Sequence, residues 1–208
     1  ERLCRTDILI IGGGAIDAGL EAEIRQLPGK VYSTYGMTET LSHIALRRLN
    51  GPDASTLYYP FPSVRLSLSP EHTLIIDAPL VCDTILVTND VAEINSDGSF
   101  SILGRKDNTI NTGGIKVQAE QVEDILRPWI HVPFAITSVS DAALGEAIVL
   151  LIENGGYTER LEEKMKELLT KYQLPKMVFS VGTIPLTETG KINRAGCRQL
   201  AATYQVGR

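Results

Sequence analysis

The chain lacks the long apolar run that a membrane-spanning helix requires. Its 208 residues are 43% hydrophobic and 22% charged, which is typical of a globular protein, and no run approaches the roughly 20 apolar residues that cross a bilayer. It also lacks basic excess, since 20 Lys and Arg face 25 Asp and Glu, for a net charge of −5. We therefore expect neither a membrane span nor a nucleic-acid partner, because non-specific nucleic-acid binding needs a basic face.

Cysteine and histidine are scarce. The three cysteines, Cys4, Cys82 and Cys197, are far apart and form no Cys-x-x-Cys pair, so we expect buried or inert thiols and a cytoplasmic protein. The histidines have no metal-ligand spacing; they are His43, His72 and His131. An initiator methionine is also lacking, and we interpret the chain as a piece of a longer polypeptide.

A strand, a glycine turn and a helix are predicted near the beginning of the chain. Residues 7–11 form a short apolar run typical of a buried parallel strand, and a helix is expected from Ala18 to Leu27. Between them lie three glycines, Gly12-Gly13-Gly14. A dinucleotide-binding turn is disfavoured, because Asp17 occupies the position of the third glycine in G-x-G-x-x-G.

Short strands with turn signals between them are predicted from Leu57 to Leu103. Asn95-Ser96-Asp97-Gly98 is a hairpin-turn signal. A spacing of about ten residues is typical of a small antiparallel barrel or sandwich. The expected strands are residues 64–68, 73–77, 84–88, 91–95 and 100–103.

The pattern becomes mixed α/β after Gly104. A helix is expected over residues 119–126, and strands over 134–139, 147–152 and 177–181. An amphipathic helix is predicted from apolar residues at helical spacing: Leu161, Met165, Leu168, Leu169 and Tyr172. We place the domain boundary at Arg105 to Asp107, with domains over residues 1–104 and 105–208.

A single lysine lies in a turn-rich loop near the end of the chain. This loop runs from Pro185 to Arg194 and contains Thr189-Gly190-Lys191. Pro185 and Gly190 indicate a loop. It is no Walker A loop, because Ile192 stands where Ser or Thr is needed. Taken alone, Lys191 is best interpreted as a solvated surface residue, but a lysine on a mobile loop can also be brought to an anionic reaction centre.

Three further motifs accompany the lysine loop. They are Tyr32-Ser33-Thr34-Tyr35-Gly36-Met37-Thr38-Glu39-Thr40, Ile85-Leu86-Val87-Thr88-Asn89-Asp90, and the stretch from Gly104-Arg105-Lys106-Asp107 through Gly113-Gly114 to Glu120 and Glu123. In this order, the four motifs resemble those of the adenylate-forming superfamily, which includes acyl-CoA ligases, peptide-synthetase adenylation domains and luciferases. The resemblance covers nearly the whole chain. It implies an α/β and α+β fold, in which the C-terminal part of a large AMP-binding domain is followed by a small lid domain.

The resemblance also implies roles in the first motif. Tyr35 and the adjoining Gly36 would meet the adenine of ATP, Thr38 would donate its hydroxyl to a phosphate oxygen, and Glu39 would bind Mg²⁺ through its carboxylate. The glycine turn at residues 12–14 would line the nucleotide and acyl pocket. Without the other motifs, Thr38-Glu39 would be better interpreted as a helix start capped by Thr38; with them, we favour the functional roles.

Further roles follow from the second and third motifs. Asp90, expected at the end of one strand and immediately before the next, would accept both ribose hydroxyls. The usual family motif is Thr-Gly-Asp, and this chain has Asn89 in place of the glycine. We expect the replacement to be harmless, because Asn tolerates the left-handed backbone that Gly would supply. Arg105 resembles the arginine on the ribose-phosphate side, and Asp107 resembles the hinge of the lid domain.

The resemblance divides the reaction into two steps. Lys191 would bridge the acyl carboxylate and the phosphate during adenylation. A rotation of the small domain would then replace it with Gly113-Gly114, which would border the pantetheine channel of CoA. The family often has lysine where Asn111 stands. A phosphate loop ending in Pro-Lys is lacking in this sequence, so we expect a missing N-terminal part of the same polypeptide and little catalysis by this piece alone.

The carboxylic acid substrate is suggested by one stretch. Residues 38–44, which contain Ser42 and His43, resemble the corresponding part of bacterial o-succinylbenzoate–CoA ligases of menaquinone synthesis, and Ser42 and His43 would line the acid pocket. Another acyl- or aryl-CoA ligase remains the alternative. A non-catalytic adenylate-binding fragment is a second class of function, disfavoured because Glu39, Asp90, Arg105 and Lys191 are all present.

Overall fold

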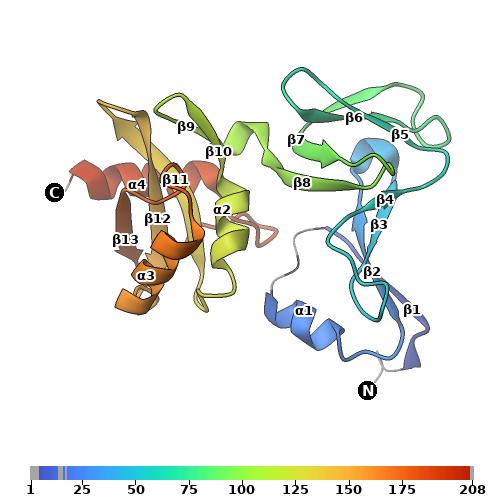
Figure 1. Ribbon diagram of the computed structural model, residues 1–208, viewed down its shortest axis with the longest axis horizontal. Helices are drawn as coiled ribbons and strands as arrows, with labels where there is room; N and C mark the ends of the chain where they lie inside the picture. Colours follow the sequence, from blue (N-terminus) through green and yellow to red (C-terminus); the bar gives the residue numbers. More distant parts are fainter. Residues whose placement is uncertain (1–4, 14–15, 17, 207–208) are drawn as a thin grey trace. The chain divides into compact units, whose positions relative to one another are not determined.

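The computed structural model describes residues 5–13, 16 and 18–206. The chain divides into two compact units, one up to Leu103 and one from Gly104 onward; we call them the N-terminal and C-terminal units (Figure 1). The dividing point lies one residue before the domain boundary proposed from the sequence. Within the described part of the chain, none of the helices is both long and apolar enough to cross a membrane.

The N-terminal unit begins with a four-stranded sheet in the order β1-β2-β3-β4. Strands β1 (Ile8–Ile11) and β2 (Lys30–Tyr35) are parallel, and the helix α1 (Ala18–Ile24) lies between them in sequence. Strands β3 (Ala45–Arg48) and β4 (Tyr59–Pro60) add in antiparallel fashion. The predicted strand–turn–helix is confirmed, although the helix ends at Ile24 rather than Leu27.

The predicted hairpin-rich region forms a second four-stranded sheet in the order β5-β6-β7-β8. Its strands are β5 (Arg65–Leu68), β6 (Thr73–Asp77), β7 (Leu86–Ile94) and β8 (Phe100–Arg105). The turn predicted at residues 95–98 is present, because the Gly98 N–H donates to the Asn95 carbonyl at 3.0 Å. Buried Leu74, Ile76 and Phe100 form part of the core of this region.

The prediction of two strands at residues 84–88 and 91–95 was wrong. The structure has one continuous strand, β7, with an irregularity in its pairing to β6. Thr73 pairs with Val91 and Ile75 pairs with Val87, so β7 carries two extra residues between these pairs. A β-bulge absorbs extra residues without ending the strand. Asn89 and Asp90, which we expected between two separate strands, lie in this bulge.

The C-terminal unit is built on a five-stranded sheet centred on β12 (Gly145–Glu153). Strand β11 (Phe134–Asp141) pairs with it antiparallel, and β13 (Met177–Val181) pairs with it parallel. The hairpin of β9 (Thr109–Thr112) and β10 (Ile115–Gln118) joins β12 at Gly145. The strands and helix predicted for this unit at residues 119–126, 134–139, 147–152 and 177–181 are all present.

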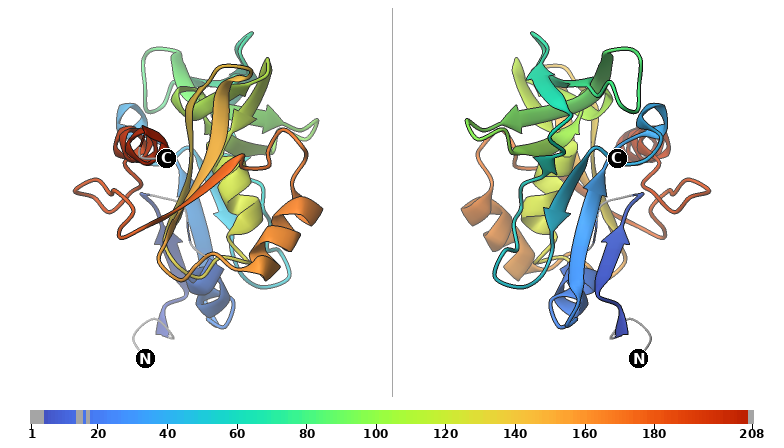
Figure 2. Two further views of the ribbon diagram at one scale, coloured as in Figure 1. Left: turned by 90° about the vertical axis from the view of Figure 1, so that its left-hand side faces the viewer. Right: turned by 90° about the vertical axis from the view of Figure 1, so that its right-hand side faces the viewer.

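Helices cover both faces of this sheet (Figure 2). On one face, Ile136, Leu150 and Ile152 pack with α2 (Ala119–Leu126) and α3 (Glu159–Leu168). On the other face, alternate residues such as Ala135 and Leu151 pack with α4 (Arg194–Val206). Burial on both faces explains why the sequence of these strands reads as a nearly continuous apolar run.

The predicted amphipathic helix is shorter than its apolar pattern suggested. Leu161, Met165 and Leu169 are buried as expected. Leu168 and Tyr172, however, are 37% and 42% exposed. The helix ends at Leu168 and Leu169 has extended backbone angles, so the 3.6-residue periodicity stops before Tyr172.

The thiols that the structure describes fit the expected inert role. Cys197 lies on the buried face of α4, and burial raises the pKa of its thiol to about 11. Cys82 is half-buried, and its thiol lies 3.3 Å from the Thr84 carbonyl. Cys4 is outside the described residues.

Candidate functional site

The first motif forms a tight loop between β2 and β3. The Ile44 N–H donates to the Tyr35 carbonyl at 2.9 Å, which closes the loop. Gly36 is required there, because a Cβ on it would lie only 2.0 Å from the carbonyl oxygen of Ser42. A single 3₁₀ turn over residues 38–40 then exposes the side chains of Thr38 and Glu39.

The cap of this turn is not Thr38, so the interpretation of Thr38 as a helix cap was wrong. Thr40 stabilises the start of the turn instead. Its hydroxyl accepts the Met37 N–H at 3.0 Å and donates to the Met37 carbonyl at 3.0 Å. Leu41 follows with φ of 60° and is 79% exposed. A left-handed backbone at a bulky residue is uncommon and is concentrated at functional sites. The loop thus presents Thr38 and Glu39 on a backbone held in an unusual shape.

The structure brings the first and second motifs together. The Tyr35 hydroxyl donates to the Asp90 carboxylate at 2.6 Å. Asp90 lies within the bulge of β7 rather than at a strand end, and its N–H donates to the Thr88 hydroxyl at 3.1 Å. Asn89 does not take the left-handed backbone expected of it, because Leu41 and His72 are the only non-glycine residues with positive φ in the described part of the chain. The bulge, rather than a left-handed residue, sets the backbone at Asp90.

Aromatic packing holds the Tyr35 ring. It lies edge-on to Phe100, with ring centroids 5.4 Å apart, and tilted against Tyr58 at 6.0 Å. Edge-to-face pairs of this kind are favourable. Together with the hydrogen bond to Asp90, they fix both ends of the Tyr35 side chain.

The remaining predicted residues of the N-terminal unit are dispersed over two loops. A Cβ on Gly12 would lie 2.6 Å from the Thr34 hydroxyl, and Gly13 has φ of 94°, so this turn needs glycine. Gly14 is outside the described residues. In the other loop, the Ser42 hydroxyl and His43 Nδ1 are 2.6 Å apart.

In the C-terminal unit, the expected hinge is an exposed segment. Residues 106–108 form a 3₁₀ turn, and Arg105 and Asp107 are joined by an ion pair at 3.4 Å. Gly104 precedes them with φ of 155°, and a Cβ on it would lie 2.5 Å from Glu120 Oε2. The third motif is therefore packed closely where it enters this unit.

The predicted glycine turn connects β9 and β10. Gly113 and Gly114 have φ of 60° and 82°, which explains the need for glycine at both positions. The Gly113 N–H donates to the Leu144 carbonyl at 2.8 Å. The exposed Asn111 donates its backbone N–H to Glu146 Oε2 at 2.9 Å, so Glu146 helps to hold the hairpin of β9 and β10.

The lysine loop is a small hairpin, which we call the lysine hairpin (residues 185–193). Leu186 and Ile192 form an isolated antiparallel β-bridge, and the Thr187 N–H donates to the Lys191 carbonyl at 2.7 Å. Gly190 has φ of 78° and completes the turn. The Lys191 side chain is exposed, and among the described residues none forms a hydrogen bond or an ion pair with its ammonium group.

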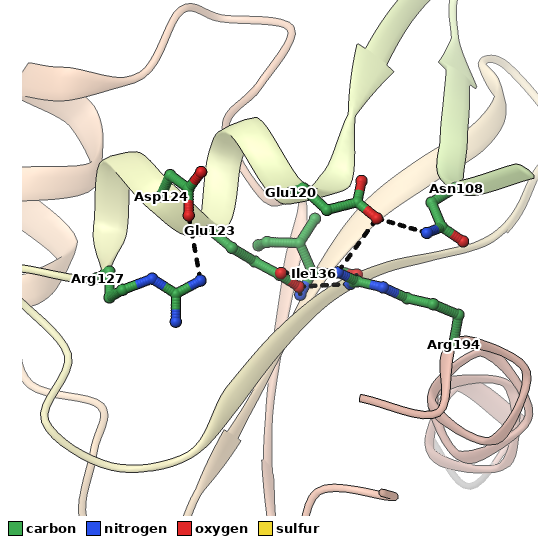
Figure 3. A network of polar contacts seen from close by, with 7 residues as sticks. All are labelled: Asn108, Glu120, Glu123, Asp124, Arg127, Ile136 and Arg194. Carbon is green, nitrogen blue, oxygen red and sulfur yellow. Dashed lines mark hydrogen bonds and ion pairs between the residues drawn. The ribbon is translucent and has the colours of Figure 1, made fainter. Parts of the chain in front are cut away.

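Two charged residues that were given no role from the sequence form a pair at the end of this hairpin, where α4 begins (Figure 3). Arg194 donates to both carboxylate oxygens of Glu123, at 2.5 and 2.8 Å. The Glu123 carboxylate also accepts the Ile136 N–H at 2.7 Å. The sequence contained a signal that Glu123 is buried, because it shares the apolar face of α2 with Ala119 and Leu126.

Burial and mutual charge act in opposition on this pair. Burial raises the pKa of the Glu123 carboxyl, and the hydrogen bonds and charge of Arg194 oppose that rise. Burial alone would lower the pKa of the Arg194 guanidinium, but Glu123 and then Glu120 raise it above its ordinary value. Arginine stays charged in proteins, so the guanidinium is a permanent cation at the root of the hairpin.

No group of three or more His, Cys, Asp or Glu side chains lies in a metal-binding arrangement in the described part of the chain. Glu39 is thus an exposed carboxylate outside any such group. Such a ligand suits Mg²⁺, which is commonly held by one or two carboxylates together with substrate phosphates.

Comparison with protein-family models finds no match to the chain. A curated relative, the 2-succinylbenzoate–CoA ligase of Lactococcus lactis, is 26% identical over 204 residues, covering 90% of this chain and 45% of the relative. The vibriobactin-specific 2,3-dihydroxybenzoate-AMP ligase of Vibrio cholerae is 32% identical over 120 residues, covering 54% of this chain and 22% of the relative. The chain thus spans less than half the length of these relatives.

A solved structure shows the same fold. The o-succinylbenzoate coenzyme A synthetase of Bacillus subtilis, in complex with ATP and magnesium ion, has a TM-score of 0.73 and 20% identity, covering 93% of this chain and 48% of that one. The relatives and structural neighbours are AMP-forming, adenylate-forming ligases, and the α/β and α+β fold expected from the sequence is confirmed.

Proposed function

We propose that this chain, whose relatives are adenylate-forming ligases, is the C-terminal portion of an enzyme that activates a carboxylic acid with ATP and passes it to CoA. In this proposal, residues 1–104 belong to the AMP-binding domain and residues 105–208 form the lid domain. The contact between Tyr35 and Asp90 carries the proposal. It joins two motifs that are 55 residues apart, and it places next to each other an aromatic side chain and a carboxylate, the two groups that we propose hold the adenosine.

The first half-reaction forms an acyl-adenylate. A carboxylate oxygen of the acid attacks the α-phosphorus of ATP, and the bond to the β-phosphate oxygen breaks to release pyrophosphate. Negative charge builds up on the α-phosphate, so the site needs cations and hydrogen-bond donors. Lys191 would supply the cation and Thr38 a hydroxyl donor, while Tyr35, Gly36 and Asp90 would hold the adenosine.

Mg²⁺ fits the exposed Glu39 in company with phosphate oxygens, because Glu39 belongs to no group of three or more potential protein ligands among the described residues. When bound, the ion would neutralise the phosphates. Arg105 would lie on the ribose-phosphate side, and the glycines at 12 and 13 would allow close approach of a flat ligand.

The second half-reaction forms the thioester. The thiol sulfur of CoA attacks the acyl carbon, its proton is lost, and AMP leaves. We propose that Asp107 is the hinge for a lid rotation between the two steps, and that Gly113-Gly114 then border the pantetheine arm. The exposed 3₁₀ turn around Asp107 supports this role, since hinges need only a few residues that change their backbone angles.

We propose o-succinylbenzoate as the acid, and a cytoplasmic enzyme of menaquinone synthesis. The similarity to the Lactococcus lactis ligase over 90% of this chain supports it, and Ser42 and His43 would line the acid pocket. An aryl-acid ligase is the second candidate, supported by the shorter but higher identity to the Vibrio cholerae enzyme.

A panel of acids tests this proposal. Pyrophosphate release would be measured with the full-length polypeptide, ATP, Mg²⁺, CoA and either o-succinylbenzoate, 2,3-dihydroxybenzoate or a medium-chain fatty acid. We expect kcat/KM for o-succinylbenzoate to exceed the others by at least about tenfold, the discrimination that one or two well-placed contacts provide. A preference for 2,3-dihydroxybenzoate would favour the second candidate, and release with none of the acids would favour a non-catalytic adenylate-binding protein.

The 208-residue chain is the matching control. It contains no glycine- and serine-rich phosphate loop, so the β- and γ-phosphates would lack their cradle of N–H groups. We expect no ATP–pyrophosphate exchange from this chain alone. Exchange as fast as that of the full-length polypeptide would contradict our assignment of the chain as a catalytically incomplete portion.

A further inference from the structure

Arg194 occupies a special position relative to the lysine hairpin. It is the first residue of α4 and follows Lys191 by three positions. The Asn193 N–H donates to the Pro185 carbonyl at 2.9 Å, so the hairpin is closed immediately before Arg194. Whatever holds Arg194 therefore also holds the end of the hairpin.

The guanidinium of Arg194 is held from two elements at once. Glu123 on α2 takes it in a bidentate pair, at 2.5 and 2.8 Å. The carbonyl of Ile136 on β11 accepts a further hydrogen bond at 3.2 Å. Bidentate pairs of arginine and carboxylate are directional as well as strong. The contacts therefore set the orientation of the guanidinium as well as its distance from the core.

Glu123 is itself immobilised. Its side chain is 3% exposed, it accepts the Ile136 N–H, and its helix packs through Val122 and Leu126 into the main core. A surface pair offers a contrast in the same helix, because Arg127 and Asp124 are 3.2 Å apart with side chains 31% and 66% exposed. Both pairs appear in Figure 3.

Stability alone is a poor explanation for an ion pair whose carboxylate is buried and whose arginine side chain is only 23% exposed. Removing two charges from water is costly, and apolar replacements of similar size are often as stable. What such a pair supplies in some proteins is a unique geometry. Here the pair fixes the position of Arg194, the residue that directly follows the lysine hairpin.

Glu120 extends the network toward the residues proposed as the hinge. Its Oε1 lies 3.4 Å from Arg194 Nη2 and also accepts a hydrogen bond from the Asn108 side chain. Asn108 ends the 3₁₀ turn that contains Asp107. The same guanidinium is thus connected to the hairpin and, through one carboxylate, to this turn.

We infer that Arg194 is a positioning residue, whose bidentate pair with Glu123 sets the placement of the lysine hairpin. Its consequence for catalysis rests on the proposed role of Lys191. The placement of the hairpin does not depend on that role, because it can be measured on this chain without substrates.

Amide hydrogen exchange of the 208-residue chain is the first test. Four hairpin amides donate hydrogen bonds whose protection can be followed by NMR: Thr187, Gly190, Lys191 and Asn193. In Arg194→Lys the fork is lost but the charge is kept. We expect these amides to exchange roughly tenfold faster, the effect of losing one hydrogen bond to a charged group, whereas the amide of Leu150 in β12 stays protected.

Two further variants separate positioning from general destabilisation. Arg127→Lys is the matched control on the exposed pair, and we expect no change in hairpin exchange. The double variant Glu123→Gln with Arg194→Met keeps an acceptor for the Ile136 N–H and removes both charges. We expect it to fold and to show the fast hairpin exchange. Unchanged hairpin exchange in Arg194→Lys and in the double variant, or an equal increase at Leu150, would overturn the inference.

Half-reaction rates in the full-length polypeptide are the second test. Arg194→Lys should lower kcat for adenylate formation about tenfold with little change in the KM for ATP, since only the placement of a transition-state group is altered. Conversion of supplied acyl-adenylate and CoA should be unaffected. Fast hairpin exchange with an unchanged adenylation rate would support the positioning and contradict the proposed role of Lys191.

Discussion

The two units hold their candidate functional residues in different ways. In the N-terminal unit, Thr38 and Glu39 stand on one short turn that is shaped by neutral hydrogen bonds from Thr40 to its own loop. In the C-terminal unit, Lys191 stands on a hairpin that ends at a largely buried ion pair between residues 71 positions apart. The placement of the first set therefore depends on local backbone geometry, whereas that of Lys191 depends on the folded core.

The cores differ as well. The central strands of the C-terminal unit are buried on both faces, as Ile148, Val149 and Leu150 show. In the N-terminal unit, strand residues such as Ile8 and Val87 are 57% and 68% exposed. The C-terminal unit therefore buries its apolar strands more completely, and we expect it to be the more stable of the two.

Among the variants that follow, a change at Asp107 is expected to have the largest effect, on the rate of one half-reaction. Proline there fixes φ and removes an N–H, changes that cost about 3 kcal/mol where the native backbone cannot accept them. If Asp107 is the hinge, Asp107→Pro in the full-length polypeptide should slow one half-reaction by roughly 10²-fold and spare the other. Rapid-quench measurement of adenylate and thioester formation checks this. Two half-reactions near their wild-type rates would show that the pivot lies elsewhere.

Tyr35→Phe should produce a smaller effect, confined to the N-terminal unit. It removes the hydroxyl that donates to Asp90 while leaving the ring against Phe100. Loss of a hydrogen bond to a charged group is worth about 1.5–3 kcal/mol, so the KM for ATP should rise roughly tenfold or more, with kcat less affected. Tyr59→Phe, at an exposed tyrosine of β4, is the control. An unchanged KM for ATP would argue against a nucleotide site at Asp90.

Equilibrium unfolding in urea tests the difference between the cores. Trp129 is the single tryptophan of the chain and lies in the C-terminal unit, where Lys164 contacts its ring. Its fluorescence therefore follows that unit, whereas far-UV circular dichroism follows both. We expect the dichroism to begin changing at lower urea than the fluorescence, because the midpoint follows stability. Coincident curves would indicate one cooperative unit instead.

The smallest effect is expected from an exposed ion pair. The Lys176 ammonium, followed by the N–H groups of Leu144 and Ala143, holds the pKa of Asp141 below its ordinary value of 3.8. A lowered folded-state pKa adds stability above pH 3.8 that is lost as the pH falls through the folded-state value. Asp141→Asn should thus be slightly less stable at pH 7, and the difference should shrink on acidification. A difference that grows toward low pH would reverse the assigned sign.

Sequence reasoning succeeded where the signals were local. The bounds of α2 and β13 were predicted correctly, because apolar periodicity and flanking turn residues are written into short stretches. The bulge at Asn89-Asp90 was missed because the same residues favour turns, and only the pairing partner β6 decides between the two. The end of α3 at Leu168 was missed for a similar reason, since the apolar pattern continues past it.

The anchoring of the lysine hairpin could not be read from the sequence with the same ease. Glu123 and Arg194 are ordinary surface residue types, and their pairing across 71 positions is a product of the tertiary fold. The proximity of Tyr35 and Asp90 is likewise a tertiary result. The resemblance named these positions, and the structure supplies the hydrogen bond between them.

The two half-reactions of Lys191→Ala test the central claim most directly. In the full-length polypeptide, adenylate formation from o-succinylbenzoate and ATP would be measured separately from conversion of supplied acyl-adenylate with CoA. Lys171→Ala is the control, at an exposed lysine of the same unit. Our account predicts a loss of roughly 10²-fold or more in adenylate formation, as expected when a charge that stabilises the transition state is removed, with thioester formation retained. Equal loss in both half-reactions, or none in either, would contradict it.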